Sequence, residues 1–319
     1  MKLVVLDGFA VNPGDLSWDF LNKYAQTVVY DKTPPELVAE RSAFADIVFT
    51  NRAEINEDIL KKCPHIKFIS ALGTGYDMID LEACKKHGIE VCNLPGYSTE
   101  SVAQFTFTLL LNLVTDINGM RGIVKNKKWT GLPGFHYEKV RFLEISGMTL
   151  GIIGYGAIGK NVGKIAKAFG MNVIATSPSR TTGSEKGIVF TALDDLLGRS
   201  DIISLHCPLN KETKGMVDKS FIKKMKDGAF LINTARGAIL NEQDVAEALD
   251  KGKLAGAALD VLADEPARED NRLLKAKNCL ITPHAAWTSV SARKRLLKIL
   301  EANLESFLKT GKGINSVIE

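Results

Sequence analysis

Residues 149–170 read TLGIIGYGAIGKNVGKIAKAFG, and this stretch decides the fold. An apolar run leads directly into the glycine pattern GxGxxG at Gly154, Gly156 and Gly159, and a helical pattern follows. The first glycine permits a tight turn, the second lets the backbone approach a pyrophosphate, and the third allows close helix packing. The order of strand, glycine turn and helix therefore predicts a dinucleotide-binding unit. An ordinary tight strand-to-helix turn is the alternative.

Short β-branched runs recur on both sides of this stretch, separated by segments with helical spacing. They are too apolar to alternate between a buried and a solvated face, so they suit strands of parallel sheets that are covered on both sides. The α/β pattern therefore predicts two doubly wound parallel-sheet domains. The expected strands are residues 2–7, 28–30, 47–50, 68–72 and 91–94, and then 149–154, 172–176, 201–207, 229–235, 255–261 and 278–283.

The length of 319 residues exceeds the size at which a single hydrophobic core stops growing. The strand pattern breaks near residues 96–99, and the last amphipathic helix, about residues 289–308, has no sheet of its own to join. We therefore predict a Rossmann cofactor domain, residues 98–287, inserted in a flavodoxin-like substrate domain, residues 1–97 plus 288–319. A cleft between them would hold the substrate.

The bulk composition excludes several classes of protein. A net charge of +4 argues against nucleic acid as a partner, and no apolar stretch is long enough to span a membrane. The five cysteines are scattered without a CxxC pair, which argues against a disulfide framework and against a metal site. We expect a cytoplasmic protein whose partner is a small molecule.

The strand after the glycine turn ends at Ser177, where an enzyme that uses NAD normally presents a carboxylate to the ribose 2′-hydroxyl. Ser177, Ser179 and Arg180 could instead hydrogen-bond and neutralise a 2′-phosphate. The sequence therefore predicts NADP in preference to NAD. The alternative is that Arg180 is an ordinary solvated cation.

Three ionisable residues follow the ends of consecutive strands in the second series: Arg236, Glu265 and His284. Ligands bind at this edge of a doubly wound sheet. Hydride transfer at the carbon of a hydroxy acid needs a proton donor or acceptor near neutral pH and a cation for the carboxylate and carbonyl oxygens. His284 and Arg236 supply these groups, and Glu265 would orient the imidazole and stabilise its protonated form. His206, also at a strand end, is the rival histidine, interpreted as structural support for the cofactor loop.

Two features of the first domain are candidates for binding the substrate carboxylate. The segment Gly73, Thr74 and Gly75 follows a strand, and successive backbone N–H groups in such a turn can form an anion-binding concavity. Arg52 follows another strand and could assist. A glycine turn that merely packs against a neighbour, and a surface arginine, are the alternatives.

Seven segments together make the chain resemble the D-isomer-specific 2-hydroxyacid dehydrogenase family along its whole length. In this sequence they read Gly73-Thr-Gly-Tyr-Asp77, Gly154-Tyr-Gly-Ala-Ile-Gly159, His206-Cys-Pro-Leu209, Asn233-Thr-Ala-Arg-Gly237, Asp260-Val261, Glu265-Pro266 and Pro283-His284. The resemblance implies that Arg236, Glu265 and His284 are the catalytic residues. It also implies a homodimer built largely on the cofactor domains.

The resemblance further assigns a set of cofactor contacts. It places Ala157 and Ile158 at the pyrophosphate, Cys207, Pro208 and Thr213 on the adenosine side, and Thr234, Ala235, Asp260 and Ala285 around the nicotinamide.

Within the family, residues 93–104 and 283–288 are most similar to the glycerate dehydrogenase and hydroxypyruvate reductase branch. This likeness implies hydroxypyruvate and D-glycerate, or glyoxylate and glycolate, as substrates, with Trp287 as a wall against bulky side chains or else a core aromatic. Phosphoglycerate or broad D-2-hydroxyacid dehydrogenase activity is an alternative. A nucleotide-sensing corepressor on the same fold is an alternative from another class.

Overall fold

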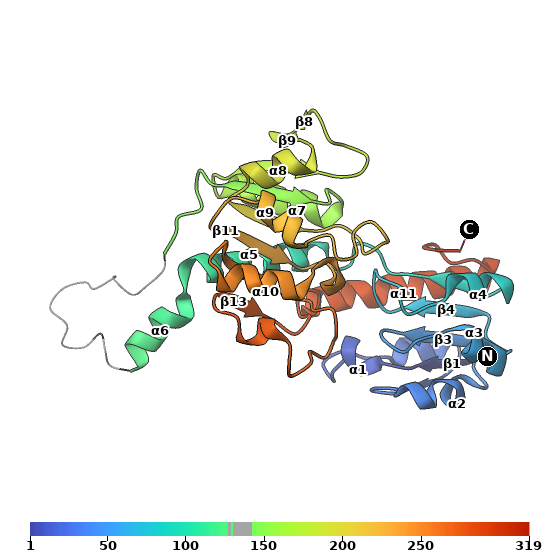
Figure 1. The fold of residues 1–319 in the computed structure, drawn as a ribbon. Helices are drawn as coiled ribbons and strands as arrows, with labels where there is room; N and C mark the ends of the chain where they lie inside the picture. Colours follow the sequence, from blue (N-terminus) through green and yellow to red (C-terminus); the bar gives the residue numbers. More distant parts are fainter. Residues whose placement is uncertain (127–128, 130–141, 319) are drawn as a thin grey trace. The chain divides into compact units, whose positions relative to one another are not determined.

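The structure is a computed structural model that describes residues 1–126, 129 and 142–318. The chain divides into two compact units. One consists of Met1–Ser98 and Thr288–Glu319, and the other of Thr99–Trp287. In Figure 1 the first unit is drawn in blue and cyan with the C-terminal helix in red.

The first unit is built on a five-stranded sheet in the order β2-β1-β3-β4-β5, with every strand pair parallel. This is the flavodoxin-like order that the strand pattern predicts. The strands are β1 Lys2–Val5, β2 Gln26–Val29, β3 Ile47–Thr50, β4 Phe68–Ala71 and β5 Glu90–Cys92, and the helices are α1 Gly8–Val11, α2 Val38–Ser42, α3 Glu57–Lys62, α4 Leu81–Lys86 and α11 Val290–Thr310.

Helix α11 belongs to the first unit although it lies at the far end of the sequence. Its Phe307 ring stacks on Phe68 of β4 with 4.6 Å between ring centroids, and Leu300 and Leu304 are fully buried. The helix therefore supplies an apolar stripe that covers the sheet, as its amphipathic pattern predicts.

The second unit contains an eight-stranded sheet in the order β13-β12-β11-β10-β6-β7-β9-β8. All neighbouring strands are parallel except β8, which runs antiparallel to β9. The strands are β6 Thr149–Ile153, β7 Asn172–Thr176, β8 Ser184–Glu185, β9 Ile188–Phe190, β10 Ile202–Leu205, β11 Ala229–Asn233, β12 Leu254–Leu259 and β13 Cys279–Ile281, and the helices are α5 Thr99–Thr115, α6 Ile117–Lys125, α7 Ala157–Ala168, α8 Leu193–Arg199, α9 Lys219–Lys224 and α10 Glu242–Asp250. The Rossmann prediction is confirmed, and the short strands β8 and β9 are additions to it.

Both faces of this sheet carry apolar layers, which is why its strands read as continuous hydrophobic runs. On β10, Ile203 and Leu205 pack into one core cluster, whereas Ile202 packs into the other. The strand order reverses between β6 and β10, and a doubly wound sheet binds its ligands at the carboxyl ends of the strands beside such a reversal.

Among the helices of the described residues, none has the length and apolar composition needed to span a membrane.

Candidate active site

The glycine turn lies between β6 and α7, next to the reversal of strand order. Gly154 has a left-handed φ of +95°, and a Cβ there would lie 2.5 Å from the backbone of His206 and Cys207. A Cβ on Gly159 would lie 2.3 Å from the Gly154 carbonyl oxygen, whereas Gly156 faces open space. Ala157 and Ile158 open helix α7, so their N–H groups belong to the positive end of its dipole. This cradle fits the pyrophosphate of a dinucleotide.

The segment after β7 forms a tight turn that brings Ser177, Ser179 and Arg180 together. Ser177 and Arg180 exchange two backbone hydrogen bonds of 3.2 and 2.9 Å. The Arg180 guanidinium lies 3.9 Å above the Phe190 ring, and it forms an ion pair with Glu185. Glu185 was missed by the sequence reasoning because it lies on β8, a two-residue strand with no sequence signal. A carboxylate at this place holds the guanidinium and would also compete with a bound phosphate for it.

The loop after β10 contains the residues expected on the adenosine side. Cys207 is buried, and burial raises the pKa of its thiol above the ordinary value. The Thr213 hydroxyl donates to the Pro208 carbonyl oxygen at 2.7 Å, which closes the loop on itself. These contacts give the loop a defined shape next to the glycine turn.

His206 has the surroundings of a structural residue. Its Nε2 lies 2.8 Å from the Ser204 hydroxyl, and its Nδ1 is buried with no hydrogen-bond partner in the part of the chain that the structure describes. Burial lowers the pKa of the His206 imidazole to about 4. The ring is therefore neutral at pH 7, and its protonation does not contribute to chemistry at that pH.

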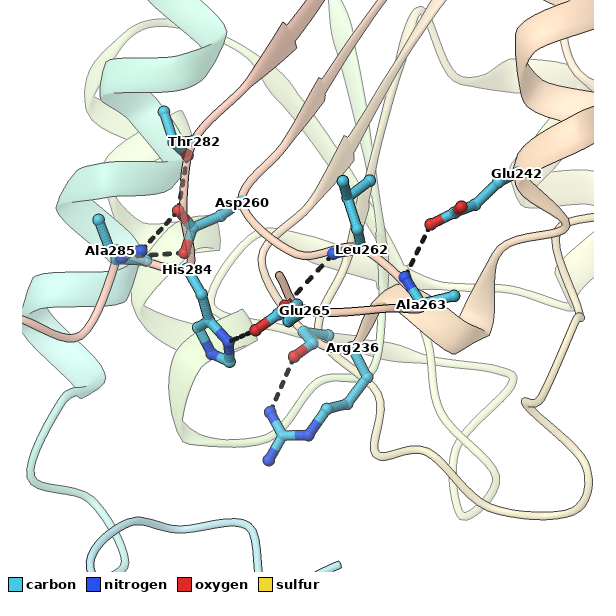
Figure 2. A network of polar contacts seen from close by, with 11 residues as sticks. Arg236, Glu242, Asp260, Leu262, Ala263, Glu265, Thr282, His284 and Ala285 are labelled. Carbon is cyan, nitrogen blue, oxygen red and sulfur yellow. Dashed lines mark hydrogen bonds and ion pairs between the residues drawn. The ribbon is translucent and has the colours of Figure 1, made fainter. Parts of the chain in front are cut away.

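The best-formed part of the site is a pair of side chains beyond the ends of β12 and β13. The Nδ1 atom of His284 lies 2.7 Å from Glu265 Oε2 (Figure 2). Because a carboxylate only accepts hydrogen bonds, Nδ1 carries the proton in this pair, and Nε2 is the ring nitrogen that can exchange a proton with a bound molecule. The other Glu265 oxygen accepts from the Leu262 N–H at 3.3 Å. Both side chains are about a quarter exposed, so they are held in place and still reachable from solvent.

Asp260 fixes the loop that carries His284. Its buried carboxylate accepts from the Thr282 hydroxyl at 2.6 Å and from the N–H groups of Ala285 and Ala286 at 2.8 and 2.9 Å. The N–H of His284 donates to the Asp260 carbonyl oxygen at 2.7 Å, and His284 adopts a left-handed φ of 55°. These bonds aim the imidazole at the edge of the sheet. Burial raises the pKa of the Asp260 carboxyl above the ordinary value.

Arg236 follows β11, the strand adjacent to β12. Its guanidinium donates to the Ala235 carbonyl oxygen at 2.8 Å, and its own carbonyl accepts from the Asn233 amide at 2.9 Å. A Cβ on Gly237 would lie 1.9 Å from the Leu262 backbone, so the segment after Arg236 packs directly on the loop that leads to Glu265. The three ionisable residues thus come from three neighbouring strands at one edge of the sheet.

Two residues of the predicted nicotinamide set lie at the same strand end. The Thr234 hydroxyl is 3.2 Å from the Thr106 hydroxyl, and the Ala235 N–H donates to the Asn233 side chain at 2.9 Å. Trp287, expected as a wall of the substrate pocket, is partly buried at the last position of the second unit.

The candidate residues for the substrate carboxylate lie in the first unit. Arg52 follows β3, and the segment of Gly73, Thr74 and Gly75 follows β4, the neighbouring strand. Both segments are therefore at the carboxyl edge of their sheet.

The arrangement in the second unit supplies a dinucleotide cradle, an imidazole held at Nδ1 by a carboxylate, and a guanidinium at the same sheet edge. A histidine imidazole can give or take a proton, and a guanidinium stabilises oxyanions. This combination suits reduction or oxidation at a carbon that bears oxygen.

Comparison with known proteins identifies the family. Residues 107–286 match the family described as D-isomer specific 2-hydroxyacid dehydrogenase, NAD binding domain. A hydroxypyruvate reductase of Blautia hydrogenotrophica is 44% identical over 321 residues, which covers 99% of each chain. A glycerate dehydrogenase of Methylorubrum extorquens is 37% identical and covers 99% of this chain and 98% of its own.

The fold is also that of a solved structure with a nicotinamide cofactor. An acyclic imino acid reductase, in complex with NADPH and D-Arg, superposes with a TM-score of 0.87. It is 33% identical, and the match covers 99% of this chain and 100% of that one. The similarity to these proteins extends over both units.

Proposed function

The chain belongs to the D-isomer-specific 2-hydroxyacid dehydrogenase family, in the hydroxypyruvate reductase branch, and on this premise we propose that it interconverts hydroxypyruvate and D-glycerate and also reduces glyoxylate. It is a nicotinamide-dependent oxidoreductase, since the family and its relatives share that chemistry. The observation that carries the proposal is the His284–Glu265 pair, which lies at the same carboxyl edge of the sheet as the glycine cradle.

A reduced nicotinamide cofactor, held by the glycine cradle of Gly154, Gly156 and Gly159, would supply a hydride for C2 of the keto acid. His284 gives the proton from Nε2 to the C2 oxygen. The hydride brings both electrons and the hydrogen on C2, and the proton from His284 becomes the hydroxyl hydrogen. Glu265 holds Nδ1 and stabilises the imidazolium before the proton leaves. In the oxidative direction, neutral His284 takes the hydroxyl proton. Metabolite concentrations set the direction.

Arg236 would bind the carboxylate and the C2 oxygen of the substrate, because a guanidinium offers several donors in a fixed plane. Arg52 and the segment Gly73–Gly75 are proposed to bind the substrate carboxylate as well. Trp287 is proposed to limit the side chain to a hydroxymethyl group or smaller. The names of the hydroxypyruvate reductase and glycerate dehydrogenase relatives support this choice of substrate.

The experiment that tests this function is the oxidation of NADPH and of NADH followed at 340 nm with a panel of keto acids. We expect the highest kcat/KM with hydroxypyruvate, lower values with glyoxylate, and little turnover of pyruvate or phosphohydroxypyruvate. Negligible turnover of every keto acid in the panel would contradict the proposed reductase activity. A preference for phosphohydroxypyruvate would reassign the substrate. The corepressor alternative has no support among the relatives compared.

We propose NADP as the preferred cofactor, bound through its 2′-phosphate by Ser177, Ser179 and Arg180. The turn that joins Ser177 to Arg180, and the stacking of the guanidinium on Phe190, support this assignment. The residues proposed to hold the rest of the cofactor are Gly154, Gly156, Ala157, Ile158, Gly159, Cys207, Pro208, Thr213, Thr234, Ala235, Asp260 and Ala285.

Replacement of Arg180 by Gln is expected to lower kcat/KM for NADPH by about ten- to a hundredfold, since a charged hydrogen-bond partner of the phosphate is lost. The value for NADH should change by less than about threefold, since NADH has no such phosphate. Steady-state kinetics with both cofactors measures this. Arg199→Gln is the control, because Arg199 is also an arginine paired with an acidic side chain in the same unit. A wild-type preference for NADH would contradict the assignment.

We further propose a cytoplasmic homodimer in which helix α6 lies at the interface. Against the described residues, α6 buries none of its nine residues, and Ile117 and Val124 expose more than half of their surface. Figure 1 shows α6 extending away from the sheet of its unit. The five cysteines are all unpaired, which suits a reducing compartment. Recovery of the protein from the culture medium of intact cells would contradict the proposed cytoplasmic location.

The double variant Ile117→Glu, Val124→Glu is expected to shift the protein from dimer to monomer, because charges in a buried apolar interface are costly. Sedimentation velocity measures the mass in solution. Lys125→Glu changes a charge on the same helix and should leave the dimer intact. A monomeric wild type, or a dimer that persists in the double variant, would contradict the role of α6.

A further inference from the structure

Asp7 is a buried carboxylate in the first unit that the mechanism above does not use. It follows β1, at the carboxyl edge of the sheet, and only 6% of its surface is exposed. A buried charge persists only where several hydrogen bonds compensate it. Its bonding partners therefore indicate what it stabilises.

Asp7 accepts hydrogen bonds at Oδ2 from donors in one segment, residues 50–53. Its Oδ2 accepts from three successive backbone N–H groups, those of Asn51 at 3.1 Å, Arg52 at 2.9 Å and Ala53 at 2.9 Å. The Thr50 hydroxyl lies 3.1 Å from the same oxygen. Successive N–H groups turned toward one point form a concavity for an anion, and here the anion belongs to the protein.

The same segment is tied to the neighbouring one. The Asn51 amide donates to the Leu72 carbonyl oxygen at 2.9 Å, immediately before Gly73. The far side of this second segment is held by the Asn93 amide, which donates to the Thr74 carbonyl oxygen at 2.8 Å. The Asp7 carboxylate thus holds the segment of residues 50–53, and the Asn51 side chain links that segment to the one that begins at Leu72.

We infer that Asp7 is a positioning residue that holds Arg52 and the segment Gly73–Gly75 in the conformation that binds the substrate carboxylate. The inference rests on the proposed function of those two segments. Asp7 contacts the backbone of Arg52: its carboxylate accepts from the Arg52 N–H, while the Arg52 side chain is exposed at the surface of the unit. Loss of the charge would leave three N–H groups without a charged acceptor and loosen both segments.

The test is the Asp7→Asn variant, which keeps the size of the side chain and removes its charge. We expect KM for hydroxypyruvate to rise by about tenfold or more, with kcat within about threefold. The affinity for NADPH, measured by fluorescence titration, should be unchanged within about twofold, because the cradle lies in the other unit. Asp80→Asn is the matched control: it removes a charge from the same unit at a helix N-cap, where aspartate and asparagine are equivalent.

A purely structural role of Asp7 would lower the melting temperature and the fraction of active enzyme without changing KM. Calorimetric titration with oxalate, a two-carbon dicarboxylate, gives a readout that is independent of turnover. Oxalate binding in the presence of NADPH should weaken in Asp7→Asn and not in Asp80→Asn. If Asp7→Asn does not fold, Asn51→Ala removes the tether to Leu72 and should raise KM in the same direction by a smaller factor.

The outcomes separate the inference from the proposed function. A wild type that does not reduce hydroxypyruvate overturns the substrate assignment, and the oxalate titration then still tests Asp7. A folded Asp7→Asn enzyme with wild-type KM and wild-type oxalate affinity overturns the inference, as does a wild type that binds no oxalate.

Discussion

Asparagine in place of His284 is expected to lower kcat for hydroxypyruvate reduction by about a hundred- to ten-thousandfold, because the proton donor to the C2 oxygen is lost. Asparagine is the appropriate replacement for two reasons. It tolerates the left-handed φ of 55° that His284 adopts, and its short polar side chain leaves the loop bonded to Asp260. Stopped-flow measurement of NADPH oxidation gives the rate of the chemical step. Binding of NADPH should be unchanged.

His206→Asn is the informative comparison. Because burial lowers the pKa of the His206 imidazole to about 4, that ring is largely neutral over the range from pH 5 to 8. Its loss should leave the pH profile of kcat in that range unchanged and should affect cofactor affinity or stability instead. If His206→Asn lowers kcat more than His284→Asn does, and the His284→Asn enzyme stays active, His206 would be the proton donor and His284 the structural residue.

The second large effect is expected for Arg236→Lys, which keeps the charge and removes the planar fork. We predict a loss of about a hundred- to a thousandfold in kcat/KM for hydroxypyruvate, comparable to the removal of one oxyanion-stabilising donor. Lysine is a compact point charge that does not reproduce the bidentate geometry. Steady-state kinetics at saturating NADPH measures the loss.

Arg272→Lys is the control for Arg236→Lys, because Arg272 is a surface residue of the same unit that pairs with Asp250 at 2.8 Å. Its replacement should leave kcat/KM within about twofold, as expected for an exposed ion pair. An Arg236→Lys enzyme that retains activity within about threefold of wild type would remove Arg236 from the proposed mechanism.

The sequence predicted those features whose cause is local. Gly154 and Gly159 are required by backbone contacts that any strand–turn–helix of this kind makes, so the cradle could be inferred from the glycine spacing together with the strand before it and the helix after it. Likewise, parallel strands buried on both faces give runs such as residues 202–205, which are visible without an alignment. That Glu265 and His284 would meet followed from their positions after neighbouring strands.

The remaining features depend on tertiary contacts that have no sequence period. Strand β8 has two residues and β9 has three, too few for an alternation to be recognised. Glu185 is opposite Arg180 only because β8 folds back on β9. Asp7 ends the run expected as the first strand, and the convergence of the N–H groups of residues 51–53 on its carboxylate is a tertiary contact without a local sequence signal.

The proposed mechanism depends on one imidazole, that of His284, which gives a proton to the substrate while Glu265 holds its other nitrogen. The most direct measurement is a crystal structure of the complex with NADPH and oxalate. We predict His284 Nε2 at about 3 Å from an oxalate oxygen, with the bond from Nδ1 to Glu265 intact. A map in which the His284 ring points away from the bound acid, with another side chain at that oxygen, would contradict the account.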